Sequence, residues 1–387
     1  MTNIKASNKA SFLFHFFLFF KLLAQILNVN LEHFRTIWSD TRCQFVQIID
    51  QTKLPFQFEV VKIDSFATML SAIKTMQVRG APLIGVAAAY GIALAMLEDE
   101  SDTHLQLAAK QLIASRPTAV NLAWAVRRMV AGLQGISERR NLAAWRLAAE
   151  IAEEDVAQNK AIGRHGLVLI RQSYQNEQFN ILTHCNAGWL ATVDYGTALA
   201  PVYAAHDAGL NVHVWISETR PRNQGAALTA WELAQHGVPH TVIADNAAGY
   251  LMQRGYSIKQ NRIDMVIVGA DRVTASGDVC NKIGTYLKAL AAFDNDIPFY
   301  AAVPSPTIDW EIAADTIEIE HRHSDELAYM TGLHADGSVQ SVRVIPQNSN
   351  AANPAFDVTP ARLVTGIITE KGVFAPSDLL KLRNISQ

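Results

Sequence analysis

The strongest constraint on the fold is a regular alternation of short apolar runs and helical stretches in the second half of the sequence. The apolar runs are rich in β-branched residues and end at glycine or polar residues, a pattern typical of buried parallel strands. These runs fall at residues 181–184, 212–216, 241–244, 265–268 and 299–303. The helical stretches fall between them, at residues 195–208, 226–235, 247–254 and 283–293. Repeated strand–helix–strand units with right-handed crossovers predict an α/β fold with a Rossmann-like, doubly wound parallel sheet.

Glycines mark where three of these helical stretches end. Gly209, Gly237 and Gly255 each stand where a left-handed residue would cap a helix. The first strand is not followed by the GxGxxG pattern of dinucleotide-binding folds, which argues against a dinucleotide site. We therefore expect no cofactor.

The preceding part of the chain is mostly helical in pattern. A strand-like run falls at 45–49. The helical stretches that follow it are rich in alanine and leucine and fall at residues 87–97, 105–115, 120–133 and 142–159. Their apolar spacing is that of a helix, and Pro82 and Pro117 stand where first helical turns are expected. We predict a mostly helical N-terminal domain over residues 33–165 and a Rossmann-like catalytic domain over residues 166–387.

Residues 1–32 do not fit this division. Lys5 and Lys9 precede an apolar run at 12–20, as in the charged and apolar regions of a signal peptide. The run is too short and too interrupted to predict a membrane span. Three interpretations compete: an export or anchor signal, an additional amphipathic helix, or upstream residues included by a wrongly assigned start codon. We favour the last, because the rest of the chain has the pattern of a complete cytoplasmic enzyme with no membrane association.

Composition argues against several other classes of protein. Hydrophobic residues make up 49% of the 387 residues and charged residues 18%, which is typical of a soluble globular protein. The net charge of −3 gives no basic excess for nucleic acid. Cys43, Cys185 and Cys280 are far apart and odd in number, which argues against a disulfide framework. The sequence has no CxxC or HExxH spacing, so we expect no metal site.

Two short motifs each place one reactive side chain just after a predicted strand. Cys185 lies in Thr-His-Cys-Asn-Ala-Gly after the run at 181–184, and Asp271 lies in Val-Gly-Ala-Asp-Arg after the run at 265–268. In an open α/β sheet, ligands bind at the carboxyl ends of the strands. A thiol and a carboxyl delivered to this edge from separate strands predict a catalytic pair.

The neighbours of each reactive residue indicate its chemistry. Small, turn-prone residues follow Cys185, so we expect an uncovered thiol beside a helix start, which would lower its pKa. His184 is adjacent, but neighbouring strand residues point to opposite faces, so it is a poor base for Cys185. Asp271 could cap a helix, or it could carry a pKa raised by apolar neighbours and donate a proton. Arg272 would instead hold that carboxylate charged.

Several segments offer donors suited to a phosphate group. Arg79-Gly80-Ala81-Pro82 precedes a predicted helix, and free N–H groups at a helix start attract anions. Asn281-Lys282-Ile283-Gly284 also leads into a helix and adds a positive point charge. Further cationic and amide donors lie at 116–118, which begins with Arg116, and at 220–225, which includes Gln224. Together they predict a site for one small phosphorylated molecule.

Longer motifs carry a specific resemblance to a known family. They are RGAPLIGVAAAYG at 79–91, RPTAVNL at 116–122, THCNAGWLAT at 183–192, ETRPRNQGAALTAWEL at 218–233, VGADR at 268–272, GDVCNKIGTY at 277–286 and NPAFDVTP at 353–360. In content and order they resemble the methylthioribose-1-phosphate isomerase family, from about residue 35 to near the carboxyl end. The wider family includes ribose-1,5-bisphosphate isomerases and the regulatory subunits of eukaryotic initiation factor 2B. Those regulatory subunits lack the Cys/Asp pair that this chain has.

The resemblance implies an aldose–ketose isomerase of methionine salvage that converts 5-methylthioribose 1-phosphate to 5-methylthioribulose 1-phosphate and forms a homodimer. It implies Cys185 as the catalytic cysteine and Asp271 as the proton-donating aspartate. The substrate contacts that it implies are Arg79, Gly80, Ala81, Arg116, Gln224, Asn281 and Lys282. Trp189 and Cys280 depart from the family pattern, because small residues are expected at both positions.

The sequence leaves two other functions open. One is an isomerase of a related sugar phosphate, ribose 1,5-bisphosphate or 5-deoxyribose 1-phosphate. A second phosphate would need another Arg or Lys cluster, whereas a thiomethyl group needs apolar walls, for which Tyr90, Trp124 and Trp189 are candidates. The other is a non-catalytic regulatory subunit that binds a sugar phosphate or a protein.

The route of hydrogen transfer is also open at this stage. Proton abstraction through an enediol and a direct hydride shift between carbon 2 and carbon 1 are both compatible with the residues. A hydride route would benefit from a dry, apolar pocket.

Overall fold

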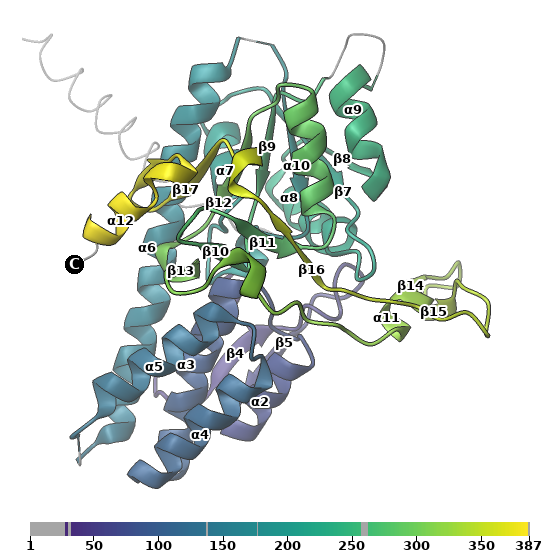
Figure 1. Ribbon diagram of the computed structural model, residues 1–387. Helices are drawn as coiled ribbons and strands as arrows, with labels where there is room; N and C mark the ends of the chain where they lie inside the picture. The colour runs from purple at the N-terminus through teal and green to yellow at the C-terminus, as the bar shows by residue number, and fades with distance from the viewer. Residues whose placement is uncertain (1–27, 30–31, 137, 176, 257–261, 386–387) are drawn as a thin grey trace, which may run out of the picture.

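The computed structural model describes residues 28–29, 32–136, 138–175, 177–256 and 262–385 (Figure 1). A helical N-terminal part and a larger α/β part lie end to end, as the sequence predicts (Figure 1). Most of the predicted extension at 1–32 falls outside the described residues. Its described residues belong to the two-residue strands β1 (Asn28–Val29) and β2 (Glu32–His33), which pair antiparallel.

The N-terminal part combines a small antiparallel sheet with a group of helices. The sheet has the order β3-β4-β5, with β3 at Ile37–Ser39, β4 at Val46–Ile49 and β5 at Val60–Ile63. The helices are α2 (Phe66–Lys74), α3 (Ala81–Glu98), α4 (Asp102–Ser115) and α5 (Val120–Leu133). They confirm the helices predicted at 87–97, 105–115 and 120–133.

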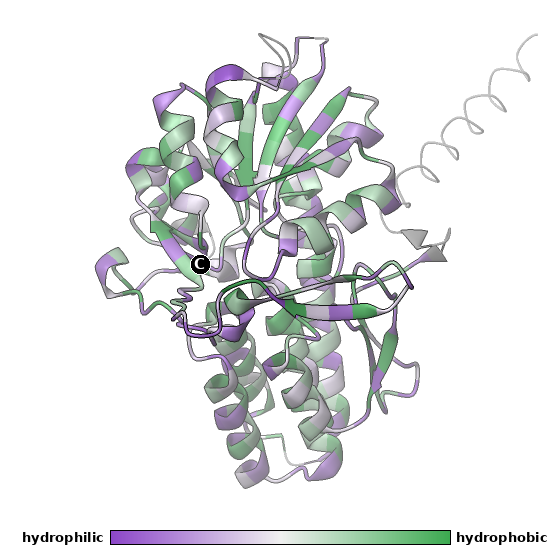
Figure 2. Ribbon diagram, turned by 90° about the vertical axis from the view of Figure 1, so that its right-hand side faces the viewer, coloured by the Kyte–Doolittle hydropathy of each residue, from purple (hydrophilic) through white to green (hydrophobic). Residues whose placement is uncertain are grey.

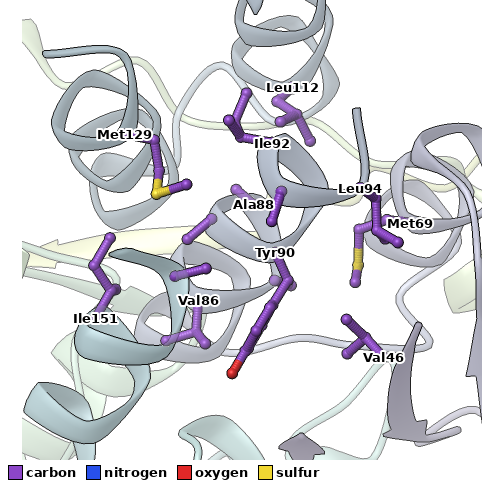
Figure 3. Close-up of a cluster of buried hydrophobic side chains, with 14 of the residues drawn as sticks. Val46, Met69, Val86, Ala88, Tyr90, Ile92, Leu94, Leu112, Met129 and Ile151 are labelled. Carbon is purple, nitrogen blue, oxygen red and sulfur yellow. The ribbon is translucent and has the colours of Figure 1, made fainter. Parts of the chain in front are cut away.

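Helix α3 lies at the centre of this part. Its residues from Ala81 to Met96 are buried, because α2, α4, α5 and α6 pack around it. Figure 3 shows Val86, Ala88 and Ile92 of this helix among side chains from the neighbouring elements. The helix is long and apolar enough to cross a membrane, but 89% of its apolar window is buried inside the protein. Its all-round hydrophobic character therefore reflects a position in the core.

Helix α6 (Arg140–Ser173) connects the two parts. It packs against α3 and α5 of the helical part and also against α7 (Ala200–Asp207) and β17 (Gly366–Thr369) of the α/β part. The domain boundary predicted at 165/166 falls inside this helix. One continuous helix thus fixes the helical part against the sheet.

The α/β part is built on a seven-stranded sheet with the order β18-β17-β12-β9-β6-β7-β8. Every neighbouring pair is parallel except β17 and β18. Its other strands are β6 (Phe179–His184), β7 (Val212–Ser217), β8 (His240–Ile243), β9 (Met265–Val268), β12 (Phe299–Ala302) and β18 (Gly372–Phe374). The helices that join or follow them are α8 (Ala230–His236), α9 (Ala248–Arg254), α10 (Thr285–Asp294) and α12 (Leu380–Ile385). The predicted Rossmann-like sheet is confirmed, and Figure 2 shows its strands as mainly hydrophobic.

The strand order reverses between β6 and β9. From β6 the chain adds β7 and β8 on one side and then returns to place β9 on the other side of β6. Such a switch point opens a crevice at the carboxyl ends of the two strands, where ligands bind in open α/β sheets. Cys185 directly follows β6 and Asp271 lies just past β9. The topology therefore brings the predicted catalytic pair to one crevice.

A smaller sheet carries the segments that follow Asp271. Its order is β13-β10-β11-β16, with β13 at Ile308–Asp309, β10 at Arg272–Thr274, β11 at Val279–Lys282 and β16 at Phe356–Thr359. Between β13 and β16, α11 (Asp325–Ala328) leads into a hairpin of β14 (Tyr329–Leu333) and β15 (Val339–Arg343). The hairpin projects from the body of the protein (Figure 1).

Two predicted helices differ in the structure for local reasons. The helix predicted at 195–208 begins only at Ala200, because Tyr195 and Gly196 have positive φ values of 69° and 76° that interrupt a helix. The helix predicted at 226–235 starts as a π turn, η2 (Gly225–Thr229), and continues as α8. Such π turns are rare and often lie at functional sites.

The proline and glycine signals had different outcomes. Pro82 lies in the first turn of α3, as predicted. Pro117 lies in the link between α4 and α5, so its predicted place in a first turn is wrong; Arg116, the residue before it, has left the helical conformation. Gly209, Gly237 and Gly255 have positive φ values of 78°, 75° and 73°. Gly237, with a ψ of 18°, is the left-handed cap that was predicted, whereas Gly255 has a ψ of 176° and is not left-handed helical.

We predict that Leu94→Ala lowers the free energy of unfolding by about 2–5 kcal/mol, because this α3 side chain is 1% exposed and its loss leaves a cavity in the core. Leu97→Ala is the matched control. This leucine belongs to the same helix but is 40% exposed, so we expect a loss below about 1 kcal/mol. Chemical denaturation followed by circular dichroism measures both variants. Equal losses would contradict the place of α3 in the core.

Candidate active site

All nine residues predicted for the site line one cavity of about 60 Å³. The cavity lies at the switch point, between the start of α3 and the carboxyl ends of β6 and β9. The nine residues are Arg79, Gly80, Ala81, Arg116, Cys185, Gln224, Asp271, Asn281 and Lys282. Met76, Arg79 and Gln224 also line a neighbouring cavity of about 790 Å³, so the site adjoins a larger space.

Hydrogen bonds hold Cys185 on both sides of its backbone. Its N–H donates to the Thr219 hydroxyl at 2.8 Å, and its carbonyl accepts from the Thr229 hydroxyl at 2.7 Å. These bonds keep the residue at a φ of 67°, a left-handed conformation that is strained for cysteine and typical of functional sites. The thiol is buried and donates to the Gln224 amide oxygen, with a sulfur–oxygen distance of 3.0 Å.

Burial raises the pKa of the Cys185 thiol above its ordinary value of 9.0, although the charges of Arg79 and Lys282 oppose the shift. The expectation of an uncovered thiol with a pKa lowered by a helix start is therefore wrong. The segment after Cys185 forms a 3₁₀ turn, η1 (Trp189–Ala191), and the thiol itself is covered. At neutral pH it acts as a neutral hydrogen-bond donor.

His184 is a neutral link between two site motifs. Its Nε2 lies 2.8 Å from the Ile283 carbonyl oxygen, so this nitrogen carries the proton and donates. Burial and the charge of Lys288 lower the pKa of the imidazole to about 3. The side chain therefore ties the end of β6 to the loop after Lys282. It is not a base for Cys185, in agreement with the prediction.

Asp271 combines burial with nearby positive charge. Burial raises the pKa of its carboxyl above the ordinary 3.8, while Lys282, Arg116 and Arg79 act in the opposite direction. The prediction of a raised pKa is thus confirmed. The carboxyl keeps its proton to a higher pH than an exposed aspartate does.

The other two interpretations of Asp271 are wrong. The residue precedes strand β10 and not a helix, so it is not a helix cap. Arg272 lies 3.5 Å from Asp309 and donates to the Thr118 carbonyl at 3.0 Å. Its charge is directed to these partners and does not hold Asp271 ionised.

Arg79, Arg116 and Lys282 give the cavity an excess of positive charge over the single carboxyl of Asp271. The Nε of Arg116 is buried and has no hydrogen-bond partner in the described part of the chain. One terminal nitrogen of the same guanidinium lies 3.5 Å from Glu320. An unpaired buried donor beside a local excess of positive charge suits an anionic ligand.

The start of α3 adds backbone donors to this positive region. Gly80 and Ala81 line the cavity, and no side chain among the described residues caps this helix end. Gly80 has a φ of 94°, and a Cβ there would lie 2.6 Å from the Ala191 backbone, so glycine is required. An anion can bind at such a helix start.

The helix start after Lys282 is already occupied. Asp357 of β16 accepts the Gly284 N–H at 2.7 Å and the Tyr286 N–H at 3.1 Å at the beginning of α10. The dipole of this helix therefore does not add to the predicted point charge at the site, because a carboxylate of the protein caps the helix start. Lys282 lines the cavity and contributes through its own charge.

Two arginines of the segment at 220–225 do not line the cavity. Arg220 donates to the Leu327 carbonyl at 2.7 Å, and Arg222 pairs with Glu326 at 2.9 Å. They hold the loop against α11 and its neighbourhood. Of this segment, Gln224 reaches the site.

The aromatic walls suggested by the sequence lie elsewhere. Tyr90 belongs to the core of the helical part (Figure 3), Trp124 lies on α5, and Trp189 is buried in the α/β core. The apolar lining comes instead from Met76, Pro82, Ile84, Val303, Pro304 and Phe356. Pro82, Ile84 and Phe356 belong to motifs quoted above, but nothing in those motifs marked them as apolar walls, and the other three lie outside the motifs.

The two departures from the family pattern are both buried. Trp189 packs in the α/β core beside Trp231, with ring centroids 5.9 Å apart. Cys280 lines a small cavity together with Asp271, and burial raises the pKa of its thiol to about 12. Neither residue lines the site cavity.

Comparison with known proteins agrees with this site. The Initiation factor 2 subunit family matches residues 77–376, a region that contains all nine site residues. A methylthioribose-1-phosphate isomerase from Brucella anthropi is 58% identical over 358 residues, which cover 91% of this chain and 97% of that protein. The chain belongs to the Initiation factor 2 subunit family.

Two solved structures of this family resemble the chain along most of its length. The 5-methylthioribose 1-phosphate isomerase from Pyrococcus horikoshii OT3 is 38% identical, with a TM-score of 0.77, and the match covers 93% of this chain and 97% of that one. The translation initiation factor eIF-2B, subunit delta, from A. fulgidus is 41% identical, with a TM-score of 0.74, and the match covers 91% and 99%. The resemblance found in the sequence motifs is thereby confirmed.

We predict that the alkylation rate of Cys185 keeps rising with pH beyond 9.0, because the thiol must lose its proton to react and burial raises its pKa. Arg79→Met removes a charge that favours the thiolate, so in this variant the alkylation rate should rise at a still higher pH. Iodoacetamide labelling at a series of pH values, with the modified cysteine identified by mass spectrometry, measures both. A wild-type rate that levels off below pH 8 would contradict the neutral thiol.

Proposed function

We propose that the protein is an aldose–ketose isomerase that converts 5-methylthioribose 1-phosphate to 5-methylthioribulose 1-phosphate, a step of methionine salvage. One observation carries the proposal: Cys185 and Asp271 line the same cavity as three cations and the start of α3. Relatives with 58% and 56% identity over most of the chain are methylthioribose-1-phosphate isomerases by name.

The phosphate group of the substrate fits the positive region of the cavity. Arg116 offers its unpaired Nε, Lys282 a point charge, and Ala81 a backbone position at the start of α3. Charge-assisted hydrogen bonds of this kind are about twice as strong as neutral ones. They can hold the sugar so that its reacting carbons lie between Cys185 and Asp271.

Ring opening is the first chemical requirement, because the anomeric oxygen carries phosphate and the substrate has no free aldehyde. Asp271 protonates the ring oxygen as a general acid, a role for which its raised pKa is suited. The bond between carbon 1 and the ring oxygen breaks, a hydrogen moves from carbon 2 to carbon 1, and the 2-hydroxyl gives its proton to the carboxylate of Asp271, which yields the ketone and restores the acid. Cys185 stabilises or transfers charge during this step.

The lining of the cavity bears on how the hydrogen moves. His184 is a poor base, because burial and Lys288 lower its pKa to about 3, so Cys185 and Asp271 are the remaining described lining residues suited to accept a proton. The pKa of each is raised, so before the reaction each is less readily ionised than an exposed group of its kind. Apolar side chains such as Met76 line the same cavity and exclude water. These features favour a hydride shift over an enediol.

A substrate labelled with deuterium at carbon 2 tests this preference. A hydride shift carries the deuterium to carbon 1, so we expect the product formed in ordinary water to retain most of it. An enediol route exposes the hydrogen to solvent and would wash the label out. Nuclear magnetic resonance of the product distinguishes the two, and a product without deuterium would contradict the hydride route.

Charge near the site favours a thiomethyl over a phosphate group at carbon 5. The adjoining larger cavity is lined by three cations, Lys53, Arg79 and Arg222, and by the carboxylates of Asp325 and Glu326. Arg222 is paired with Glu326 and Arg79 also lines the site cavity, so a second phosphate would meet Lys53 as the one remaining cation among the described lining residues. Ribose 1,5-bisphosphate is therefore the poorer substrate.

A regulatory subunit is the second candidate, since the similar A. fulgidus structure is called an initiation factor subunit. Cys185 and Asp271 line one cavity here, and both pKa values are shifted by its burial. Perturbed titratable groups gathered in one cleft favour an enzyme. Turnover of 5-methylthioribose 1-phosphate by the purified protein decides between the two candidates.

We further infer a cytoplasmic homodimer. The homodimer rests on the family resemblance of the sequence motifs. Cys43, Cys185 and Cys280 are all free, and this supports a reducing compartment. Light scattering on the purified protein tests the dimer, and cell fractionation tests the compartment.

We predict that Asp271→Asn and Cys185→Ser each lower kcat by about 10²–10⁴-fold with KM changed little, because each removes a group that acts on the reacting atoms. Steady-state assays with 5-methylthioribose 1-phosphate measure both constants. Near-normal turnover in either variant would remove that residue from the mechanism.

Lys282→Ala is expected to act on binding. Loss of its charge should raise KM about tenfold or more, the effect of one charge-assisted hydrogen bond. Lys53→Ala is the matched control, since Lys53 is a lysine of the larger cavity and does not line the site. An unchanged KM in Lys282→Ala would refute its contact with the phosphate.

A further inference from the structure

A buried carboxyl that the proposed mechanism does not use lies behind the cavity wall. Glu232 of α8 is 0% exposed, and its Oε1 accepts from the Asn186 side-chain amide at 2.7 Å. Its Oε2 accepts the Leu190 N–H at 3.2 Å. Burying a carboxyl is costly unless both oxygens find partners, and here both do.

Asn186 connects Glu232 to the cavity. Its side-chain oxygen and its carbonyl oxygen both accept from the Arg79 guanidinium, the carbonyl at 2.7 Å. Its amide nitrogen donates to Glu232 and also to the Thr229 hydroxyl, at 3.1 Å. These partners permit one orientation of the amide, because the reverse would turn its NH₂ group toward the guanidinium.

The backbone near Glu232 is shaped around the carboxyl. A Cβ on Gly188 would lie 1.7 Å from Oε1, so glycine is required at that position. Burial raises the pKa of Glu232 to about 8, while the Leu190 N–H, Asn186 and Arg79 favour its charged form. With a proton on Oε2, the carboxyl still presents Oε1 to Asn186.

We propose that Glu232 is a positioning residue: acting through Asn186, it holds the Arg79 guanidinium in the orientation that binds the phosphate of the substrate. The inference rests on the proposed function, since it takes the ligand to be a sugar phosphate. A carboxyl suits the position because each oxygen faces an N–H donor, from Asn186 and from Leu190. An isosteric amide would set its own NH₂ group against one of these donors.

Glu232→Gln is the direct test. We expect KM for 5-methylthioribose 1-phosphate and the dissociation constant of inorganic phosphate to rise together, each about tenfold, because Arg79 loses its fixed orientation. We expect kcat to change by less than about threefold. A role in packing alone would lower the thermal unfolding midpoint without moving the two binding constants.

The double variant Asn186→Asp with Glu232→Gln exchanges the amide and the carboxyl. The new carboxylate accepts from Arg79 with one oxygen and from the new amide with the other, and the new amide oxygen accepts the Leu190 N–H. The donors of Arg79, the new amide and Leu190 thus face acceptors again, and the contact that is not restored is the one from residue 186 to the Thr229 hydroxyl. We expect KM and the phosphate dissociation constant to return to within about threefold of wild type.

Asp155→Asn is the matched control. Asp155 is a buried carboxyl of α6 that accepts the Val193 N–H at 2.7 Å, and it does not line the site cavity. We expect its binding constants to equal those of wild type. Isothermal titration with inorganic phosphate and steady-state assays supply the data for all four proteins.

Three results would overturn the proposal: unchanged binding constants in Glu232→Gln, an equal rise in Asp155→Asn, or no recovery in the double variant. If Glu232→Gln fails to fold, the double variant alone decides. A wild-type protein that binds phosphate without isomerising the sugar would overturn the proposed function. Phosphate titration would then still test Glu232.

Discussion

The site depends on the backbone pairing of β6 with β9. Ile181 pairs with Met265 and Leu182 with Val266, so the two strands end level with each other at the carboxyl edge of the sheet. Cys185 and Asp271 leave these ends from segments that are far apart in the chain. Their meeting in one cavity is therefore a property of the sheet's hydrogen bonding and its switch point. Helix α6 packs both against α3 and against the α/β part, so it fixes the helical part to the sheet.

Burial then determines the chemistry of both residues. It raises the pKa of the thiol and of the carboxyl, so each group keeps its proton to a higher pH than it would when exposed. Arg79 and Lys282 moderate both shifts and also attract a phosphate. A site with these two properties binds an anionic ester and places beside it an acid that keeps its proton to a higher pH than an exposed aspartate does. The same cations that attract the phosphate thus oppose the protonation of the acid, and burial outweighs their effect.

Sequence reasoning succeeded where one short segment contains the whole signal. The runs at 181–184 and 265–268 predict strands, and the residues that follow them predict the site. It failed where a distant residue decides: Asp357 fills the start of α10 from another strand, and Asp309 draws Arg272 away from Asp271. No local pattern specifies such partners. The buried state of Cys185 was missed for the same reason, since its cover comes from several segments.

The motif at 218–233 is long, although Gln224 is its single predicted ligand contact. Three of its other residues have a structural role that helps to explain the length. Thr219 and Thr229 fix the backbone of Cys185, and Glu232 orients Asn186. These three residues of the motif therefore support the turn that follows β6 and do not line the cavity. The strained backbone of Cys185 and the buried guanidinium of Arg79 both need such support, because neither is favourable without it. The positions of the side chains that line the cavity thus depend on the segment at 218–233, which packs behind them.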